Sequence, residues 1–166
     1  DYRGEVSVIP GPAGLTAVNR LGLESYLAGV LSAEMGRRDP TEVQALYAQA
    51  VISRTFAVKN AGKRRALGFD LYGTVADQVY GGVGAETPQS WDAVRMTRAE
   101  VVTWNGRPID AFFYSTCGGR TESGTASSQP VPERCPPPDS RLISCGMSSL
   151  LELRPDQRTK GQPGRR

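Results

Sequence analysis

At Leu23 the spacing of the apolar residues changes from that of a strand to that of a helix. Upstream, apolar and polar residues alternate on both sides of a segment rich in Pro and Gly, which predicts a hairpin or two neighbouring strands. The alternating apolar residues are Val6, Val8, Leu15 and Ala17. Downstream, apolar residues recur every three or four positions, as on one face of a helix; they are Leu23, Tyr26, Leu27, Val30 and Leu31. The chain must therefore place a helix directly after a strand.

A second helix is predicted soon after the first. Gly36 can end the first helix in a left-handed conformation. Asp39, Pro40 and Glu42 then supply an N-cap, a proline at the first helical position and the partner of a capping box. The predicted helix runs from Pro40 to about Lys59, and its apolar face comprises Val43, Leu46, Tyr47 and Ala50.

Each of these two apolar faces also carries a charged residue. Eleven positions at about 100° each make almost three whole turns, so Glu34 lies on the same stripe as Leu23. Arg54 continues the stripe of the second helix. Desolvation favours the uncharged form of a carboxyl on an apolar face, and the partial negative charge at a helix C-terminus acts in the same direction. A lone buried Glu is more often a paired structural charge than a catalyst, so the position alone does not decide its role.

Shorter elements are predicted in the middle of the chain. The stretch GKRRALGFD is expected to be a solvated basic loop, and DQVYGGVGAET a Gly-rich loop after a short strand. A helix capped by Thr87 and Pro88 should follow, with Trp91 and Val94 on its inner face. The clearest strand signal is a hairpin of residues 101–104 and 109–114 around an Asn-Gly turn.

Beyond about Thr125 the sequence is rich in Pro, Ser and Arg, with isolated apolar residues and no repeat. Such composition is typical of a flexible tail. We therefore predict one α+β domain over residues 1–125, in which two consecutive helices line a groove, and a tail over residues 126–166 that is either disordered or a divergent end of the domain.

The composition excludes several function classes. The 166 residues suffice for one ordinary domain. The net charge is only +3, and the sequence has no dense basic stripe of the kind that nucleic-acid binders carry. The chain contains no His, which excludes Ser-His-Asp, Cys-His and His-based metal chemistry. Proton transfer would then need a carboxyl, Lys, Tyr or Cys. Three widely spaced Cys form no disulfide framework, and Cys135 with Cys145 is the most plausible single bridge.

No targeting segment or membrane span is predicted. No apolar run is long enough to cross a bilayer. The sequence opens at Asp1 without a signal or lipidation motif, as expected of an excised or mature segment.

Four segments, in their order and separation, resemble the SpoIID/LytB family of cell-wall proteins: LGLESYLAGVLSAEM, ALYAQAVISRTFAV, DQVYGG and FFYSTCGGRTES. The resemblance covers residues 2–123. The family includes lytic transglycosylases, which cut peptidoglycan strands lacking stem peptides, and LytB-type proteins described as modifiers of a wall amidase. The resemblance therefore implies a cell-wall protein outside the cytoplasm that acts on glycan strands and works beside other wall hydrolases.

The resemblance also implies which residues form the site. It maps the catalytic acid onto Glu34. It assigns groove residues to Arg54, Gln49, Tyr80, Tyr114, Ser115 and Thr116, with Gly118 and Gly119 in a turn whose amides face the groove. Some relatives carry a His and Cys pair before the QVY segment and are associated with zinc. Val75, Ala76 and Asp77 stand there in this chain, so we expect no metal and no cofactor.

The chemistry of a lytic transglycosylase suits a single carboxyl. The 6-hydroxyl of the muramic acid attacks its own anomeric carbon, so the enzyme needs one acid rather than the two carboxyls of a hydrolase. Arg54 is expected near Glu34 but not in contact with it, because a close cation would favour the ionised acid.

Several alternatives stay open. Arg54 could be a core ion-pair partner of Glu34 or Glu42, Gln49 could satisfy backbone groups, and the two Tyr could be packing residues. After GGRTE the chain also departs from the family's usual continuation. The alternative function is therefore a noncatalytic wall-binding or amidase-modifying module.

Overall fold

The chain begins with the predicted hairpin. Strand β1, Glu5–Gly11, pairs antiparallel with β2, Gly14–Gly22, in a register that places Val8 opposite Ala17. Val18 of β2 is fully buried and packs with Phe69, against which Ile9 and Tyr72 also lie. One face of the hairpin is therefore covered by a later part of the chain, as strands of a half-buried sheet require.

The computed structural model describes residues 1–11, 14–36, 38–113 and 150–154, the last of these by their backbone only. The described residues up to 112, together with 150–154, belong to one compact unit. Residues 113–147 form a second unit, of which only Phe113 is described.

Both predicted helices are confirmed. Helix α1, Leu23–Met35, starts directly after β2 and ends at Gly36, which has a positive φ of 66° and donates its N–H to Ser32 O at 3.0 Å. A 3-10 turn, Pro40–Glu42, leads into helix α2, Val43–Asn60. The predicted capping box is present: Asp39 accepts from the Thr41 N–H at 2.9 Å and donates its own N–H to Glu42 at 3.3 Å.

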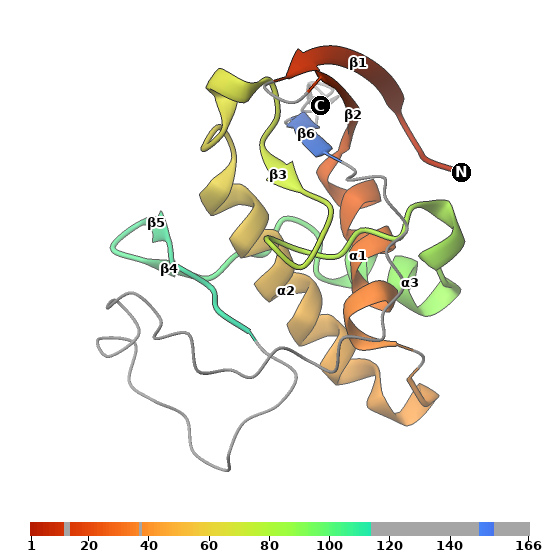
Figure 1. The fold of residues 1–166 in the computed structure, drawn as a ribbon. Helices are drawn as coiled ribbons and strands as arrows, with labels where there is room; N and C mark the ends of the chain where they lie inside the picture. Colours follow the sequence, from red (N-terminus) through yellow and green to blue (C-terminus); the bar gives the residue numbers. More distant parts are fainter. Residues whose placement is uncertain (12–13, 37, 114–149, 155–166) are drawn as a thin grey trace, which may run out of the picture. The chain divides into compact units, whose positions relative to one another are not determined.

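Helix α3, Pro88–Met96, is capped as predicted by Thr87, which forms a capping box with Ser90. Its residue Val94 is buried and Trp91 is half-buried, as expected for its inner face. The three helices α1, α2 and α3 pack against one another (Figure 1). Together with Leu21, Leu71 and Tyr80 from outside the helices, they form the main hydrophobic core, whose helical members are Tyr26, Leu27, Ala28, Val30, Leu31, Leu46, Ala50, Ala57, Ala93 and Val94.

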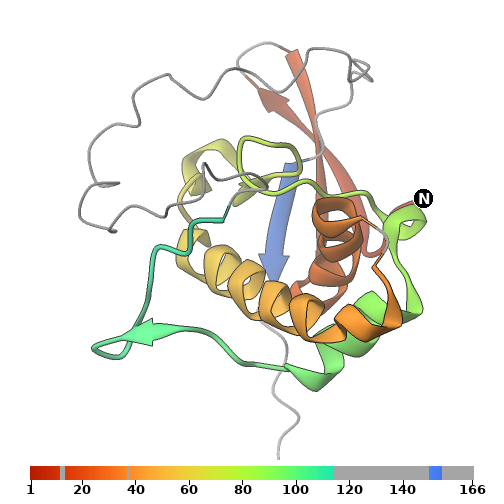
Figure 2. The same ribbon diagram turned by 90° about the horizontal axis from the view of Figure 1, so that it is seen from below.

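The sheet is completed by a strand from the predicted tail. Strand β3, Leu71–Tyr72, and strand β6, Leu150–Arg154, join the hairpin in the order β1-β2-β6-β3. Strand β6 runs parallel to β2 and antiparallel to β3. Figure 2 shows β6 in blue beside the hairpin. Residues 150–154, within the predicted tail, thus form a strand of this sheet. The nonlocal pairing stabilises a run too short to be recognised by its period. Residues 114–149 and 155–166 lie outside the described residues.

The second hairpin is shorter than predicted. Strands β4, Thr103–Trp104, and β5, Arg107–Pro108, flank the Asn-Gly turn, in which Asn105 and Gly106 have positive φ angles of 49° and 72°. The turn is confirmed, but no strand follows over residues 109–113. Pro108 carries no N–H and so cannot donate to the ladder, which limits its extension.

These elements make the described unit an α+β domain, as predicted. Among the described residues, none of the helices has the length and apolar character needed to cross a bilayer.

Candidate active site

Glu34 lies in the last turn of α1, on the stripe predicted for it. Its side chain is half-buried, and Oε1 accepts a hydrogen bond of 2.7 Å from the backbone N–H of Val79. Within the described part of the chain, no Lys or Arg forms a salt bridge with this carboxyl. Among the described residues, Glu34 is therefore held by one neutral donor and has no cation as partner.

This donor, the Val79 N–H, belongs to the loop that connects β3 to α3 and packs against α1. Gly81 N–H donates to Gly29 O at 3.2 Å, and the Tyr80 ring packs so closely on Gly29 that a Cβ there would lie 2.5 Å from Tyr80 Cε2. Gly29 thus permits the loop to approach the helix. The QVY segment is in this way fixed against the same helix that carries Glu34.

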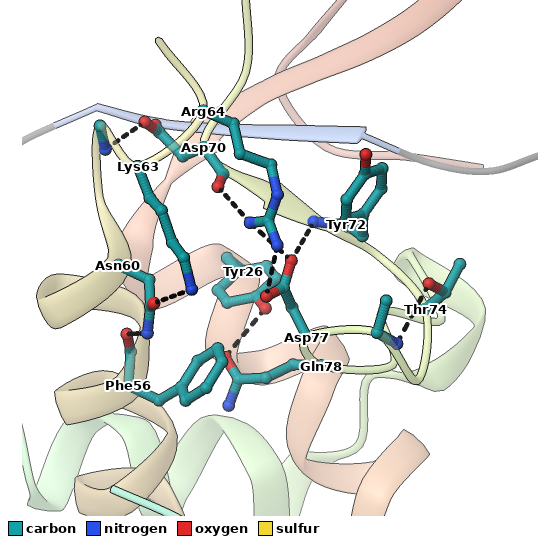
Figure 3. Close-up of polar contacts among 12 residues, drawn as sticks. Tyr26, Phe56, Asn60, Lys63, Arg64, Asp70, Tyr72, Thr74, Asp77 and Gln78 are labelled. Atoms are coloured by element: carbon teal, nitrogen blue, oxygen red, sulfur yellow. Dashed lines mark hydrogen bonds and ion pairs between the residues drawn. The ribbon is translucent and has the colours of Figure 1, made fainter. Parts of the chain in front are cut away.

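Two further side chains fix this loop. Gln78 Oε1 accepts from the Tyr26 hydroxyl at 2.9 Å, and the Asp77 carboxylate pairs with Arg64 at 2.9 Å (Figure 3). Burial raises the pKa of Tyr26 well above its usual value, and the nearby charges of Asp77 and Glu34 raise it further. The Tyr26 hydroxyl consequently stays protonated and a donor at neutral pH.

Arg54 does not lie where the sequence analysis placed it. Its guanidinium is 1% exposed and forks onto Glu24, with Nε to Oε1 at 3.0 Å and Nη2 to Oε2 at 2.7 Å. The other N–H groups donate to Thr97 Oγ1, Glu100 O and Val94 O.

Glu24 is ten residues before Glu34, about 15 Å along the helix axis. The expectation that Arg54 lies beside Glu34 is therefore wrong, and so are the two ion pairs considered for it. All five guanidinium N–H groups already have acceptors, so none is left for a sugar.

Tyr80 is likewise a core residue. It is 5% exposed and its ring lies between those of Tyr2 and Tyr26, at centroid distances of 6.1 and 5.5 Å. Burial raises the pKa of Tyr80 to about 12, with a smaller contribution from the Glu86 charge. The structure thus gives Tyr80 the packing role that had been the alternative to a groove residue.

Gln49 is half-buried on α2 and donates to Ser53 Oγ at 3.1 Å, one turn later in the same helix. This contact is with a side chain and not with the backbone group that the alternative foresaw. The remaining predicted groove residues, Tyr114, Ser115, Thr116, Gly118 and Gly119, lie outside the described residues, as do Cys117, Cys135 and Cys145.

A cavity of about 230 Å³ lies near the end of α1, on the side of Ser32 and Gly36 and not on the side of Glu34. It is lined by Ser32, Gly36, Arg38, Leu46, Thr87, Pro88 and Gln89, none of which was predicted as a site residue. In the part of the chain that the structure describes, no three His, Cys, Asp or Glu side chains gather as a metal site would require.

The sequence analysis missed four residues that build this site: Tyr26, Arg64, Asp77 and Gln78. Arg64 had been placed in a solvated basic loop, but its side chain is only 18% exposed. Arg64 stands between two other basic residues, so the sequence does not distinguish its structural role from that of a solvated charge. The available signal was the Asp directly before QVY, a carboxylate that needs a partner once it is buried.

The fold and the contacts of Glu34 define an α+β domain in which a half-buried carboxyl at the end of a buried helix has no salt bridge with any described residue. The family model described as "Stage II sporulation protein" (SpoIID) matches residues 12–104. This chain belongs to the SpoIID family.

Curated relatives agree with this assignment. An uncharacterized protein of Brachyspira hyodysenteriae is 39% identical over 74% of this chain and 33% of its own length. Stage II sporulation protein D of Bacillus subtilis is 34% identical over 66% of this chain and 36% of its own. The amidase enhancer of the same organism is 34% identical over 75% and 17%. The matched part is thus about a third of these relatives or less. No solved structure matches the chain.

Proposed function

We propose that this chain carries the catalytic domain of a peptidoglycan lytic transglycosylase with Glu34 as its single acid and base. The enzyme would cleave between MurNAc and GlcNAc and leave a 1,6-anhydroMurNAc end, without a cofactor, on strands that lack stem peptides. Membership of the SpoIID family supports a role related to the cell wall. The observation that carries the proposal is the half-buried Glu34 carboxyl, which accepts one backbone hydrogen bond and has no salt bridge within the described residues.

The first step is protonation of the leaving group. A glycosidic oxygen leaves poorly unless it receives a proton as the bond breaks. The Val79 N–H engages Oε1, so a proton on the Glu34 carboxyl is best placed on Oε2. Glu34 gives this proton to the glycosidic oxygen, and the bond from that oxygen to C1 of MurNAc breaks.

The second step forms the new bond. The 6-hydroxyl oxygen of the same MurNAc attacks C1, and its proton passes to the Glu34 carboxylate. The acid is thereby regenerated, no water is consumed, and the product is the 1,6-anhydro ring. A second carboxyl is not needed because the nucleophile belongs to the substrate.

Binding of the sugar is assigned to the remaining predicted groove residues: Gln49, Tyr114, Ser115, Thr116, Gly118 and Gly119. Arg54 and Tyr80 are excluded from this set because both are buried and packed into the core. Their role in the proposed enzyme is to hold α1 and the QVY loop in place.

Mass spectrometry of peptide-free glycan strands tests the proposal. The parent chain should release fragments ending in 1,6-anhydroMurNAc, and Glu34→Gln should lower the rate by about 10²- to 10⁴-fold, the usual contribution of general acid–base catalysis. Glu100→Gln is the control, since it makes the same change at an exposed position. Intact strands after incubation with the folded parent, or equal rates for parent and Glu34→Gln, would refute it.

A second candidate is a noncatalytic module that binds wall glycan and modifies an amidase. It is favoured by the likeness to a relative named amidase enhancer, which extends over 75% of this chain. Under this alternative the parent binds glycan without cleaving it, and Glu34→Gln binds equally well. Adding the chain to a wall amidase and following the rate of amide cleavage would distinguish the two candidates.

Both functions place the protein outside the cytoplasm, in the wall or periplasm, with peptidoglycan strands and other wall hydrolases as partners. Fractionation of cells that produce the natural protein with an epitope tag would test this location. Recovery of the tag in the cytoplasmic fraction alone would contradict it.

A further inference from the structure

Three consecutive residues before Tyr80 each contact a different part of the fold. Asp77 pairs with Arg64 of the segment after α2, Gln78 accepts from Tyr26 of α1, and the Val79 N–H donates to Glu34. A backbone held at three successive positions has little freedom to rotate. The direction of the Val79 N–H is consequently set by the side chains that precede it.

Asp77 is the most strongly held of the three. Its carboxylate is 3% exposed and forms an ion pair with Arg64 Nη1 at 2.9 Å; it accepts hydrogen bonds from Arg64 Nη2 at 3.1 Å and from the Tyr72 N–H at 2.8 Å (Figure 3). Charge-assisted, forked bonds of this kind fix both distance and orientation. Asp77 thus ties the QVY loop to β3 and to the segment after α2 at once.

Arg64 is itself held in place. Its Nη1 also donates to Asp70 O at 3.1 Å, and its guanidinium lies 4.6 Å from the centre of the Tyr72 ring. Asp70 accepts in turn from the Gly62 N–H at 2.6 Å. The cation is therefore a fixed anchor and not a mobile surface charge, and the ion pair transmits this rigidity to the loop (Figure 3).

We propose that Asp77 is a positioning residue for Glu34: anchored by Arg64, it fixes the Val79 N–H, and this N–H selects the oxygen of Glu34 that is free to exchange the proton. The inference rests on the proposed function for its effect on turnover. Its geometric part concerns Asp77, Val79 and Glu34 alone. The two parts can be tested separately.

Proton NMR tests the geometric part without any substrate. The Val79 amide signal of the parent should shift as Glu34 is titrated, and the shift should be lost in Glu34→Gln. In Asp77→Asn the shift should fall to less than half and the Val79 amide should exchange with solvent at least about tenfold faster. Asp92→Asn is the matched control, because Asp92 also pairs with an Arg, at 3.5 Å, but on α3. An unchanged Val79 amide in Asp77→Asn would overturn the proposal.

A second variant keeps the test decisive if Asp77→Asn does not fold. Arg64→Lys retains the positive charge but loses the fork, so it should shift the Val79 amide in the same direction and by a smaller amount. A folded Arg64→Lys with a parental Val79 signal would equally overturn the positioning role.

Turnover supplies the remaining readout. If the parent cleaves glycan, Asp77→Asn should lower kcat about 10- to 100-fold and leave KM within about twofold, because misplacement affects the reacting acid and not the bound sugar. Added to Glu34→Gln, it should lower the residual rate no further. A change in KM alone would overturn the proposal. A parent that cleaves nothing but shows the expected Val79 response refutes the proposed function and leaves the positioning intact.

Discussion

The two ends of α1 each carry a glutamate on its inner side, but the two carboxyls have opposite surroundings. Glu24, in the first turn, receives a forked pair of bonds from a buried Arg. Glu34, in the last turn, receives one backbone N–H. The helix dipole adds to the contrast, since it stabilises an anion at the N-terminus and destabilises one at the C-terminus.

Under the proposed function, this contrast separates a structural carboxyl, Glu24, from the reacting one, Glu34. The Glu24 carboxylate is fixed by a bound guanidinium. The Glu34 carboxyl meets only a neutral donor among the described residues. The position of a buried acid on a stripe thus says less than the identity of its partner, and the following predictions test that difference.

Removing Arg54 should have the largest effect. In Arg54→Met the Glu24 carboxylate loses its partner, and Thr97 and two carbonyls lose a donor, so the free energy of unfolding should fall by about 3–5 kcal/mol. Urea denaturation followed by circular dichroism measures it. The double variant with Glu24→Gln should lose less than the sum of the single changes, because the buried charge is then absent. Strict additivity would show that the pair is not coupled.

Gly29→Ala should have the next largest effect. Its Cβ would meet Tyr80 Cε2 at 2.5 Å and Gly82 O at 3.1 Å, so the loop must move away from α1. Overpacking of this kind costs about 1–3 kcal/mol. Thermal unfolding gives the stability, and glycan cleavage should fall at the same time. Gly84→Ala is the control, since a Cβ there meets nothing within 4 Å.

Glu34→Gln should change stability far less than it changes turnover. The Gln amide oxygen can still accept from the Val79 N–H, so unfolding should shift by less than about 1 kcal/mol. The same urea experiment provides the value. A loss as large as that of Arg54→Met would break the comparison, because Glu34 would then be a structural charge as well.

Tyr80→Phe should have the smallest effect at neutral pH. The Tyr80 hydroxyl is buried and finds no hydrogen-bond partner within the described residues. Removing such a group should alter the unfolding free energy by no more than about 0.5 kcal/mol.

The same variant should differ from the parent at alkaline pH. The pKa of Tyr80 is raised to about 12, above the value of about 10 for an unfolded Tyr. Its contribution to stability is complete below pH 10 and is lost as the pH rises through about 12. Melting temperatures between pH 8 and 11 should therefore fall less steeply in Tyr80→Phe. Parallel curves would contradict this assignment.

Local pattern was sufficient to predict the helices and the place of Glu34. Periodicity placed Glu34 on the inner stripe, and the caps at Asp39 and Thr87 act through neighbouring residues, so no tertiary information was needed. Burial of Arg54 followed from the same reasoning.

The partners could not be predicted in this way, because they depend on packing between distant segments. Helices α1 and α2 run in opposite directions (Figure 1). Both helices rise 1.5 Å per residue, so residues at equal distances before the end of α1 and after the start of α2 lie side by side, as Glu24 and Arg54 do. That arithmetic would have identified Glu24. No comparable rule leads to Arg64 with Asp77, or to β6, because both are fixed by contacts between separate elements.

The place of β6 in the sheet also determines when the sheet can be completed during synthesis. The ribosome completes β2 and β3 well before β6, the strand that lies between them in the sheet. At about 5–20 residues per second, roughly 6–25 s pass between β2 and β6. During that interval β2 presents an open edge, which other nascent chains can pair with. A chaperone that occupies this edge until residue 154 has emerged would raise the yield of folded protein.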